Sequence, residues 1–228
     1  MKSLEAATHN LFFTGKGGVG GGPAFYPVLE RYVITRIGEF GLIPLERKVQ
    51  LESLAEYVRG QLATGRPAKL TFVCTHNSRR SQLSQVWAHV AADSYCLKDV
   101  ETYSGGTEAT AFNPRAVAAM QRSGLSVTML DGDAPNPRYQ VKAAAGSATQ
   151  ECFSKRFDAP PNPSSGYCAV MTCSQADQAC PSVMGSDLRL AIRYDDPKIA
   201  DDTDQESQRY DERSAQICRE MLFMASRV

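Results

Sequence analysis

The sequence lacks an excess of charge of either sign. Its 228 residues carry 25 basic and 25 acidic side chains, so the formal net charge is zero. Proteins that bind nucleic acid or an anionic membrane through their overall field carry a positive excess or basic blocks. We therefore expect neither a nucleic-acid partner nor a membrane partner.

Long hydrophobic runs are also missing. No run approaches the roughly 20 apolar residues that cross a bilayer, and the N-terminus shows no basic segment followed by an apolar one, as a secretory signal has. The sequence therefore predicts a cytoplasmic protein. With 43% hydrophobic residues, the chain can bury a core for one domain with extensions.

Histidine is scarce, and its three copies are scattered at positions 9, 76 and 89. No nearby set of Cys and His completes four ligands, so we expect no zinc or other metal site. Cysteine is more frequent, but its count of seven is odd. Reduced thiols are therefore expected rather than a disulfide scaffold. Four of them are interpreted as packing residues: Cys96, Cys152, Cys168 and Cys218.

The N-terminal stretch LFFTGKGGVGGG starts like a nucleotide-binding loop. The phosphate-binding pattern G-x-x-x-x-G-K-[ST] places a lysine and a hydroxyl residue after its second glycine. Gly21 and Gly22 stand in these two places, so we expect no ATP site. Residues 1–22 are interpreted as a flexible Gly-rich leader.

Apolar periodicity divides the rest of the chain. Residues 23–67 show apolar spacings of three and four, which predicts a helical extension. From residue 68 onward, short β-rich runs alternate with helical ones, which predicts an α/β domain with a parallel sheet and flanking helices. The predicted strands are KLTFVC, VETYSGG, LSVTML, YCAVMTC and RLAIRYDDP. A Pro-, Gly- and Ser-rich insertion near 131–166 interrupts this domain, and a long helix over 201–228 closes it.

The strongest chemical feature is VCTHNSRRS, in which Cys74 ends a predicted strand, Arg80 follows after five residues, and a helix begins. Backbone N–H groups of such a loop, together with the helix N-terminus, cradle a tetrahedral oxyanion. The same field favours the reactive thiolate of Cys74, and the Arg80 guanidinium can grip two anion oxygens. Ser81 is placed to hydrogen-bond the thiolate. The remaining loop residues are predicted to bind substrate: Thr75, His76, Asn77, Ser78 and Arg79.

This signature resembles V-C-x-G-N-x-C-R-S of the low-molecular-weight protein tyrosine phosphatase superfamily, which includes thioredoxin-coupled arsenate reductases. YSGGTEATAFNPRAVAAM is similar to a second segment of that superfamily. The resemblance implies a flavodoxin-like fold with a central four-stranded parallel sheet over residues 68–228. His76 and Arg79 depart from the usual glycine and second cysteine of the motif.

The resemblance also implies a general acid. Asp196 directly precedes Pro197 in YDDP, which is similar to the Asp-Pro loop of the superfamily. Asp196 is therefore predicted to protonate the leaving oxygen, with Asp195 as the fallback.

A pair of cysteines separates two possible activities. Cys173 and Cys180 in MTCSQADQACP resemble the redox segment of thioredoxin-coupled arsenate reductases. The implied cycle forms a Cys74–arsenic adduct, then a Cys74–Cys173 disulfide, then a Cys173–Cys180 disulfide, which thioredoxin or another thiol reduces. Arsenate reduction is accordingly the first prediction.

Two alternatives remain open. One is a phosphatase that hydrolyses phosphotyrosine or small phosphomonoesters through a cysteinyl phosphate. The other is a non-catalytic module that binds arsenate, phosphate or a similar oxyanion. No tyrosine follows Pro197 in DPKIADD to hold a phosphotyrosine ring, which favours the reductase.

Overall fold

The structure is a computed structural model that describes residues 24–132, 134–179 and 183–228. Outside these residues lie Cys180 and the predicted Gly-rich leader, which includes the stretch where no ATP site is expected. Among the described helices, none has both the length and the apolar character needed to cross a bilayer.

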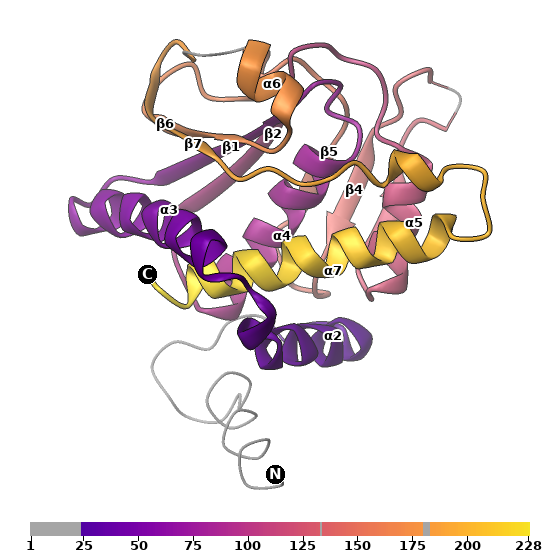
Figure 1. Cartoon of the computed structure of the whole chain (residues 1–228), viewed down its shortest axis with the longest axis horizontal. Coiled ribbons are helices and arrows are strands. Elements are labelled where there is room, and N and C mark those ends of the chain that lie inside the picture. The colour runs from indigo at the N-terminus through magenta and orange to yellow at the C-terminus, as the bar shows by residue number, and fades with distance from the viewer. Residues whose placement is uncertain (1–23, 133, 180–182) are drawn as a thin grey trace, which may run out of the picture.

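A four-stranded parallel sheet forms the centre of the molecule (Figure 1). Its strands are β1 (Ala68–Cys74), β2 (Val100–Gly106), β6 (Tyr167–Met171) and β7 (Ser186–Ala191). Their order across the sheet is β2-β1-β6-β7. The inner strands β1 and β6 are almost wholly buried, as expected for strands that are covered on both faces. The predicted α/β architecture is confirmed.

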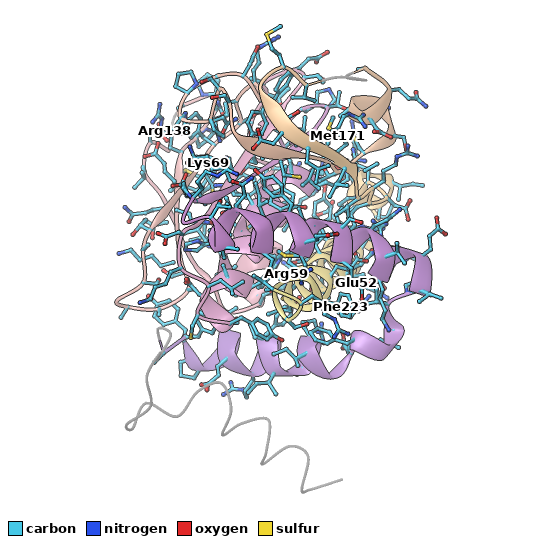
Figure 2. The ribbon with its side chains drawn as sticks, turned by 90° about the vertical axis from the view of Figure 1, so that its left-hand side faces the viewer. Glu52, Arg59, Lys69, Arg138, Met171 and Phe223 are labelled. Atoms are coloured by element: carbon cyan, nitrogen blue, oxygen red, sulfur yellow. The ribbon has the colours of Figure 1, made fainter. Side chains whose placement is uncertain are left out.

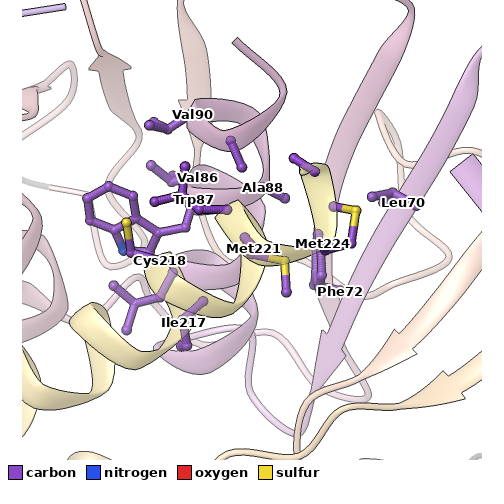
Figure 3. Close-up of a cluster of buried hydrophobic side chains, with 14 of the residues drawn as sticks. Leu70, Phe72, Val86, Trp87, Ala88, Val90, Ile217, Cys218, Met221 and Met224 are labelled. Atoms are coloured by element: carbon purple, nitrogen blue, oxygen red, sulfur yellow. The ribbon is translucent and has the colours of Figure 1, made fainter. Parts of the chain in front are cut away.

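One face of this sheet packs against α4 (Arg80–Ser94), which in turn packs on the longest described helix, α7 (Glu206–Ala225). Leu70 and Phe72 of β1 lie beside the methionines of α7, as Figure 3 shows. Trp87 of α4 is fully buried and donates from its indole nitrogen to Ser214 Oγ of α7 at 2.9 Å. The indole therefore brings its apolar surface into the core while its one polar atom keeps a partner.

The N-terminal extension contains α2 (Pro27–Gly38), the 3-10 turn η1 (Phe40–Leu42) and α3 (Leu45–Ala63). Helix α2 packs on α7, and α3 packs on α7, β1 and β7. Figure 2 looks onto α3, with Glu52 and Arg59 along it and Phe223 of α7 beneath. The extension thus shares the core of the α/β domain: Tyr32 stacks on Trp87 with ring centroids 5.4 Å apart.

A second, antiparallel sheet corrects one strand prediction. Residues 126–129 do not join the parallel sheet, because β3 (Ser126–Met129) pairs with β4 (Tyr139–Lys142), which pairs with β5 (Gln150–Cys152). The physical reason is exposure: three of the four residues of β3 face solvent, whereas an inner parallel strand is buried on both faces. The Pro- and Gly-rich segment 131–166 therefore contains two strands of a separate sheet.

Other elements differ in their bounds. Helix α5 (Pro114–Arg122) lies where predicted, but α7 begins at Glu206 because residues 201–205 form turns that include Asp202 at φ 62°. The short helix α6 (Ser174–Ala179) and the 3-10 turn η2 (Pro197–Ala200) were not predicted. Cys96 is exposed, so its interpretation as a packing residue is wrong.

Candidate active site

The candidate site lies at the carboxyl edge of the sheet, between β1 and β6. The chain leaves β1 toward β2 on one side and later returns to β6 on the other, so the strand order reverses here. Crevices for ligands in open α/β sheets form at this kind of switch point. Cys74 is the last residue of β1, and α4 begins at Arg80. Residues 74–81 between them are called the anion loop below.

Asn77 shapes the anion loop from inside. Its backbone is left-handed, at φ 47°, and its side chain is fully buried. Asparagine tolerates this conformation better than most residues. The side-chain oxygen accepts from Gln82 Nε2 at 3.2 Å and from the Lys155 backbone N–H at 3.0 Å. The turn is therefore fixed by hydrogen bonds of the Asn77 side chain to residues outside the loop.

The other side-chain atom of Asn77 sets the polarity of the nucleophile's hydrogen bond. Asn77 Nδ2 donates to Ser81 Oγ at 2.8 Å, and Ser81 Oγ lies 3.1 Å from Cys74 Sγ. Because an amide nitrogen can only donate, the hydroxyl accepts from Asn77 and its own proton is free to point at the sulfur. This arrangement favours a negatively charged sulfur, which is the nucleophilic form of cysteine.

The segment after β5 supports the loop from outside. Gln82 Nε2 donates to the Phe153 carbonyl at 2.8 Å, and Ser154 Oγ donates to the His76 carbonyl at 2.9 Å. Lys155 is buried and completes the contact through its backbone N–H on Asn77. Sequence reasoning missed these residues, because an irregular segment has no periodicity that predicts where it docks.

Gly106 shows how closely the backbones approach behind the loop. A Cβ at this position would lie 2.2 Å from the Glu108 carbonyl oxygen and 2.7 Å from that of Thr75. The Gly106 N–H donates to the Lys155 carbonyl at 2.8 Å. Only a residue without a side chain fits at this end of β2.

Arg80 and Asp196 face each other across the mouth of the loop. Arg80 Nη2 donates to Asp196 Oδ2 at 2.7 Å, and Arg80 Nη1 donates to the Tyr194 carbonyl at 3.2 Å. Asp196 is one-third exposed and caps η2 by accepting from the Lys198 N–H. Asp195, the fallback acid, is 97% exposed and pairs with Arg213 instead. The structure thus brings Asp196, and not Asp195, to the predicted loop.

Arg79 lies beside the loop within a polar network. Its Nε donates to Tyr210 Oη at 2.8 Å, and its Nη2 lies 3.6 Å from Asp201 Oδ2. Nε also lies 4.0 Å from Asp196 Oδ1. Burial, followed by the hydrogen bond to Asp201, raises the pKa of Tyr210 to about 12. The guanidinium is therefore shared among α7 and the loop that carries Asp196.

The remaining loop residues have different surroundings. The Ser78 carbonyl accepts from the Asn113 N–H at 2.9 Å, which ties the loop to the start of α5. His76 is half exposed, with Nε2 3.6 Å from Glu108 Oε2. Thr75 faces the segment that follows β6, because its Oγ1 lies 3.5 Å from Cys173 Sγ and 3.3 Å from Gln175 Oε1.

Cys173 lies immediately beside the anion loop. It follows β6, the strand hydrogen-bonded to β1, and only 1% of it is exposed. Its sulfur accepts from the Ala176 N–H at 3.3 Å, inside the first turn of α6. Cys74, Cys173 and Ala176 belong to one buried cluster. The Cys173 sulfur thus lies 3.5 Å from the hydroxyl of Thr75, the residue that follows Cys74.

The other described thiols lack such surroundings. Burial raises the pKa of Cys152 to about 12 and that of Cys218 well above its usual value. Burial also raises the pKa of Cys168. Within the described ranges, no three His, Cys, Asp or Glu side chains are grouped as a metal site would require.

Comparison with known proteins agrees with this geometry. Residues 69–139 match the family described as low molecular weight phosphotyrosine protein phosphatase. An arsenate reductase of Halalkalibacterium halodurans is 28% identical over 135 residues, which cover 59% of this chain and 78% of that protein. An arsenate reductase of Bacillus subtilis is 35% identical over 86 residues, which cover 36% and 59%.

Solved structures with some likeness were also found. A low molecular weight phosphotyrosine phosphatase from Vibrio cholerae has a TM-score of 0.45 at 12% identity, covering 70% of this chain and 95% of that one. A thioredoxin-dependent arsenate reductase from Corynebacterium glutamicum has a TM-score of 0.37 at 17% identity, covering 82% and 81%. The match over residues 69–139 and the curated relatives support the resemblance of this chain to the low-molecular-weight protein tyrosine phosphatase superfamily.

Proposed function

We propose that this protein is an arsenate reductase that converts arsenate to arsenite with electrons from cysteine thiols. The observation that carries the proposal is the position of Cys173, whose sulfur lies 3.5 Å from the Thr75 hydroxyl of the anion loop. A phosphatase needs only the nucleophile, the anion loop and the general acid. A reductase also needs a second thiol that can form a disulfide with the nucleophile. The arsenate reductases among the relatives support the same reading.

The first proposed step forms an arsenic–sulfur bond. Backbone N–H groups of the anion loop and Arg80 hold the arsenate oxygens. The Cys74 thiolate attacks arsenic, and one oxygen leaves as water after accepting a proton from Asp196. The product is a Cys74 adduct in which arsenic is still pentavalent. Arg80 Nη2 donates to Asp196 Oδ2 at 2.7 Å, so the anion would compete with the carboxylate for the guanidinium.

The second step transfers two electrons. The Cys173 thiolate attacks Cys74 Sγ, a disulfide forms, and the sulfur–arsenic bond breaks with its electron pair on arsenic, which leaves as arsenite. Cys180 then attacks Cys173 and releases Cys74 as a thiolate. A dithiol such as thioredoxin reduces the Cys173–Cys180 disulfide by the same exchange, which closes the cycle.

Two cysteine substitutions test the cycle. Cys173→Ser should stop multiple turnover of arsenate, measured as arsenate-dependent oxidation of a thioredoxin system, because the adduct cannot be reduced. Cys180→Ser should allow one turnover and then accumulate the Cys74–Cys173 disulfide, seen by mass spectrometry. Cys96→Ser, which removes an exposed thiol, is the matched control and should keep full activity. Normal arsenate reduction by both Cys173→Ser and Cys180→Ser would show the mechanism to be wrong.

A phosphatase activity is the second candidate, favoured by the family match of residues 69–139. The same Cys74, Arg80 and Asp196 would form and hydrolyse a cysteinyl phosphate. This candidate predicts hydrolysis of an aryl phosphate that persists in Cys173→Ser, with no arsenate turnover in the wild type. Tight oxyanion binding without either turnover would instead indicate the non-catalytic module.

A further inference from the structure

The N-terminal extension reaches the loop that carries Asp196 through Arg47. This residue lies in the first turn of α3. Its Nη2 donates to the Arg193 carbonyl at 2.6 Å, and its guanidinium carbon lies 5.3 Å from the centroid of the Tyr194 ring. Arg47 is therefore in contact with two consecutive residues of the loop between β7 and η2.

Tyr194 transmits this contact to the site. Its side chain is buried, its N–H donates to the Thr172 carbonyl at 3.0 Å, and its own carbonyl accepts from Arg80. Asp196 follows two residues later and pairs with the same Arg80. The backbone that sets the place of Asp196 is thus held by β6, by the anion loop and by α3.

A buried charge makes the Arg47 contact specific. Glu220 of α7 is 2% exposed, and its Oε2 lies 3.6 Å from Arg47 Nε. Its other oxygen accepts from Gln216 Nε2 at 3.0 Å. The Glu220 carboxylate also acts, after burial itself, to raise the pKa of the Tyr194 phenol. Burying an unpaired carboxylate is costly, and Arg47 supplies a cation 3.6 Å from Glu220 Oε2 beside the Tyr194 ring.

We propose that Arg47 is a positioning residue for Asp196: the extension holds the general-acid loop in its productive place by clamping Arg193 and Tyr194. The proposal rests on the proposed role of Asp196 as general acid. It assigns the extension a part in catalysis through the loop that carries Asp196.

A double-mutant cycle separates positioning from general stabilisation. Arg47→Ala should lower kcat/KM for arsenate about tenfold or more, since misplacement by roughly 1 Å can cost about a hundredfold. Asp196→Asn removes the acid itself. If Arg47 acts through Asp196, adding Arg47→Ala to Asp196→Asn should lower kcat/KM no further. A full Arg47→Ala penalty in the Asp196→Asn background would overturn the proposal.

Matched variants control for folding. Arg59→Ala removes another arginine of α3 that also donates to a backbone carbonyl, that of Arg227 at 2.5 Å, and it should keep kcat/KM unchanged. Arg47→Lys keeps a cation that can reach the Arg193 carbonyl and should recover part of the loss. Equal losses in Arg47→Ala and Arg59→Ala would indicate a merely structural role and overturn the proposal.

A second measurement keeps the inference separate from the proposed function. If the wild type turns over aryl phosphate but not arsenate, reduction is refuted and the same cycle is run with aryl phosphate. If it turns over neither, hydrogen exchange at the Tyr194 amide decides. Exchange should be faster in Arg47→Ala than in the wild type and unchanged in Arg59→Ala. An unchanged Tyr194 amide in Arg47→Ala would refute the clamp.

Discussion

The hydrogen bond from Ser81 to Cys74 offers a direct test of how the nucleophile is activated. Ser81→Ala removes the donor that lies 3.1 Å from the sulfur. A hydrogen bond to a charged group contributes about 1.5–3 kcal/mol, which corresponds to a roughly 10- to 150-fold change in an equilibrium constant. We expect the alkylation rate of Cys74 at neutral pH to fall by up to that factor.

Iodoacetamide is a suitable reagent, because the thiolate is the form of cysteine that it alkylates. The rate at Cys74 is followed by peptide mass spectrometry, which distinguishes it from the exposed Cys96. Ser84→Ala is the matched control: Ser84 is equally buried in α4, but its hydroxyl donates to the Arg80 carbonyl at 2.8 Å rather than to sulfur. Its Cys74 should react at the wild-type rate.

The same substitution carries a separate cost in stability. Without the hydroxyl oxygen, Asn77 Nδ2 loses the acceptor to which it donates at 2.8 Å. An unsatisfied buried donor costs about 1–3 kcal/mol, so urea unfolding should report a loss of that order. If Ser81→Ala is alkylated as fast as the wild type at every pH, the hydroxyl does not stabilise the thiolate and the assigned polarity is wrong.

Two further predictions concern the support of the loop. Gly106→Ala should lower the free energy of unfolding by at least about 1–3 kcal/mol, the usual cost of an overpacked site, because the added Cβ would lie 2.2 Å from the Glu108 carbonyl oxygen. A urea unfolding midpoint equal to that of the wild type would contradict this prediction. Burial lowers the pKa of Lys155 from 10.5 to about 8, so the unfolded chain binds more protons between these values and the stability contributed by this residue rises with pH there. Lys155→Met should therefore raise the free energy of unfolding below pH 8 by on the order of 1–3 kcal/mol. This stabilisation should shrink as the pH approaches 10.5. If urea unfolding shows a stabilisation that does not change with pH, the lowered pKa of Lys155 is refuted.

The sequence predicted the sheet well where strands are buried on both faces. The runs that became β1 and β6 are continuous and apolar, which distinguishes them from neighbouring turns. It failed at 126–129, because a short run of β-formers does not reveal which sheet it joins, and pairing with β4 is decided by tertiary contacts. Helix α6 was missed since six residues are too few to show periodicity.

For the candidate site, too, the sequence predicted some residues and missed others. Cys74, Arg80 and Ser81 could be found because they are adjacent in one motif, and Asp196 because it precedes a proline. The supports at Phe153, Ser154 and Lys155 are more than 70 residues away from the loop that they hold. Their contacts are made by backbone atoms and one hydroxyl, which leave no pattern in the sequence.

The docking of that distant segment has a consequence for the order of folding. The family match ends at residue 139, yet the His76 carbonyl and the Asn77 side-chain oxygen of the anion loop accept hydrogen bonds from Ser154 and Lys155. Contacts of such large sequence separation are closed late, because the intervening chain must first lose its freedom. We therefore expect the anion loop to reach its final geometry only once the segment after β5 has docked, so that a nascent chain ending before this segment would lack these two hydrogen bonds.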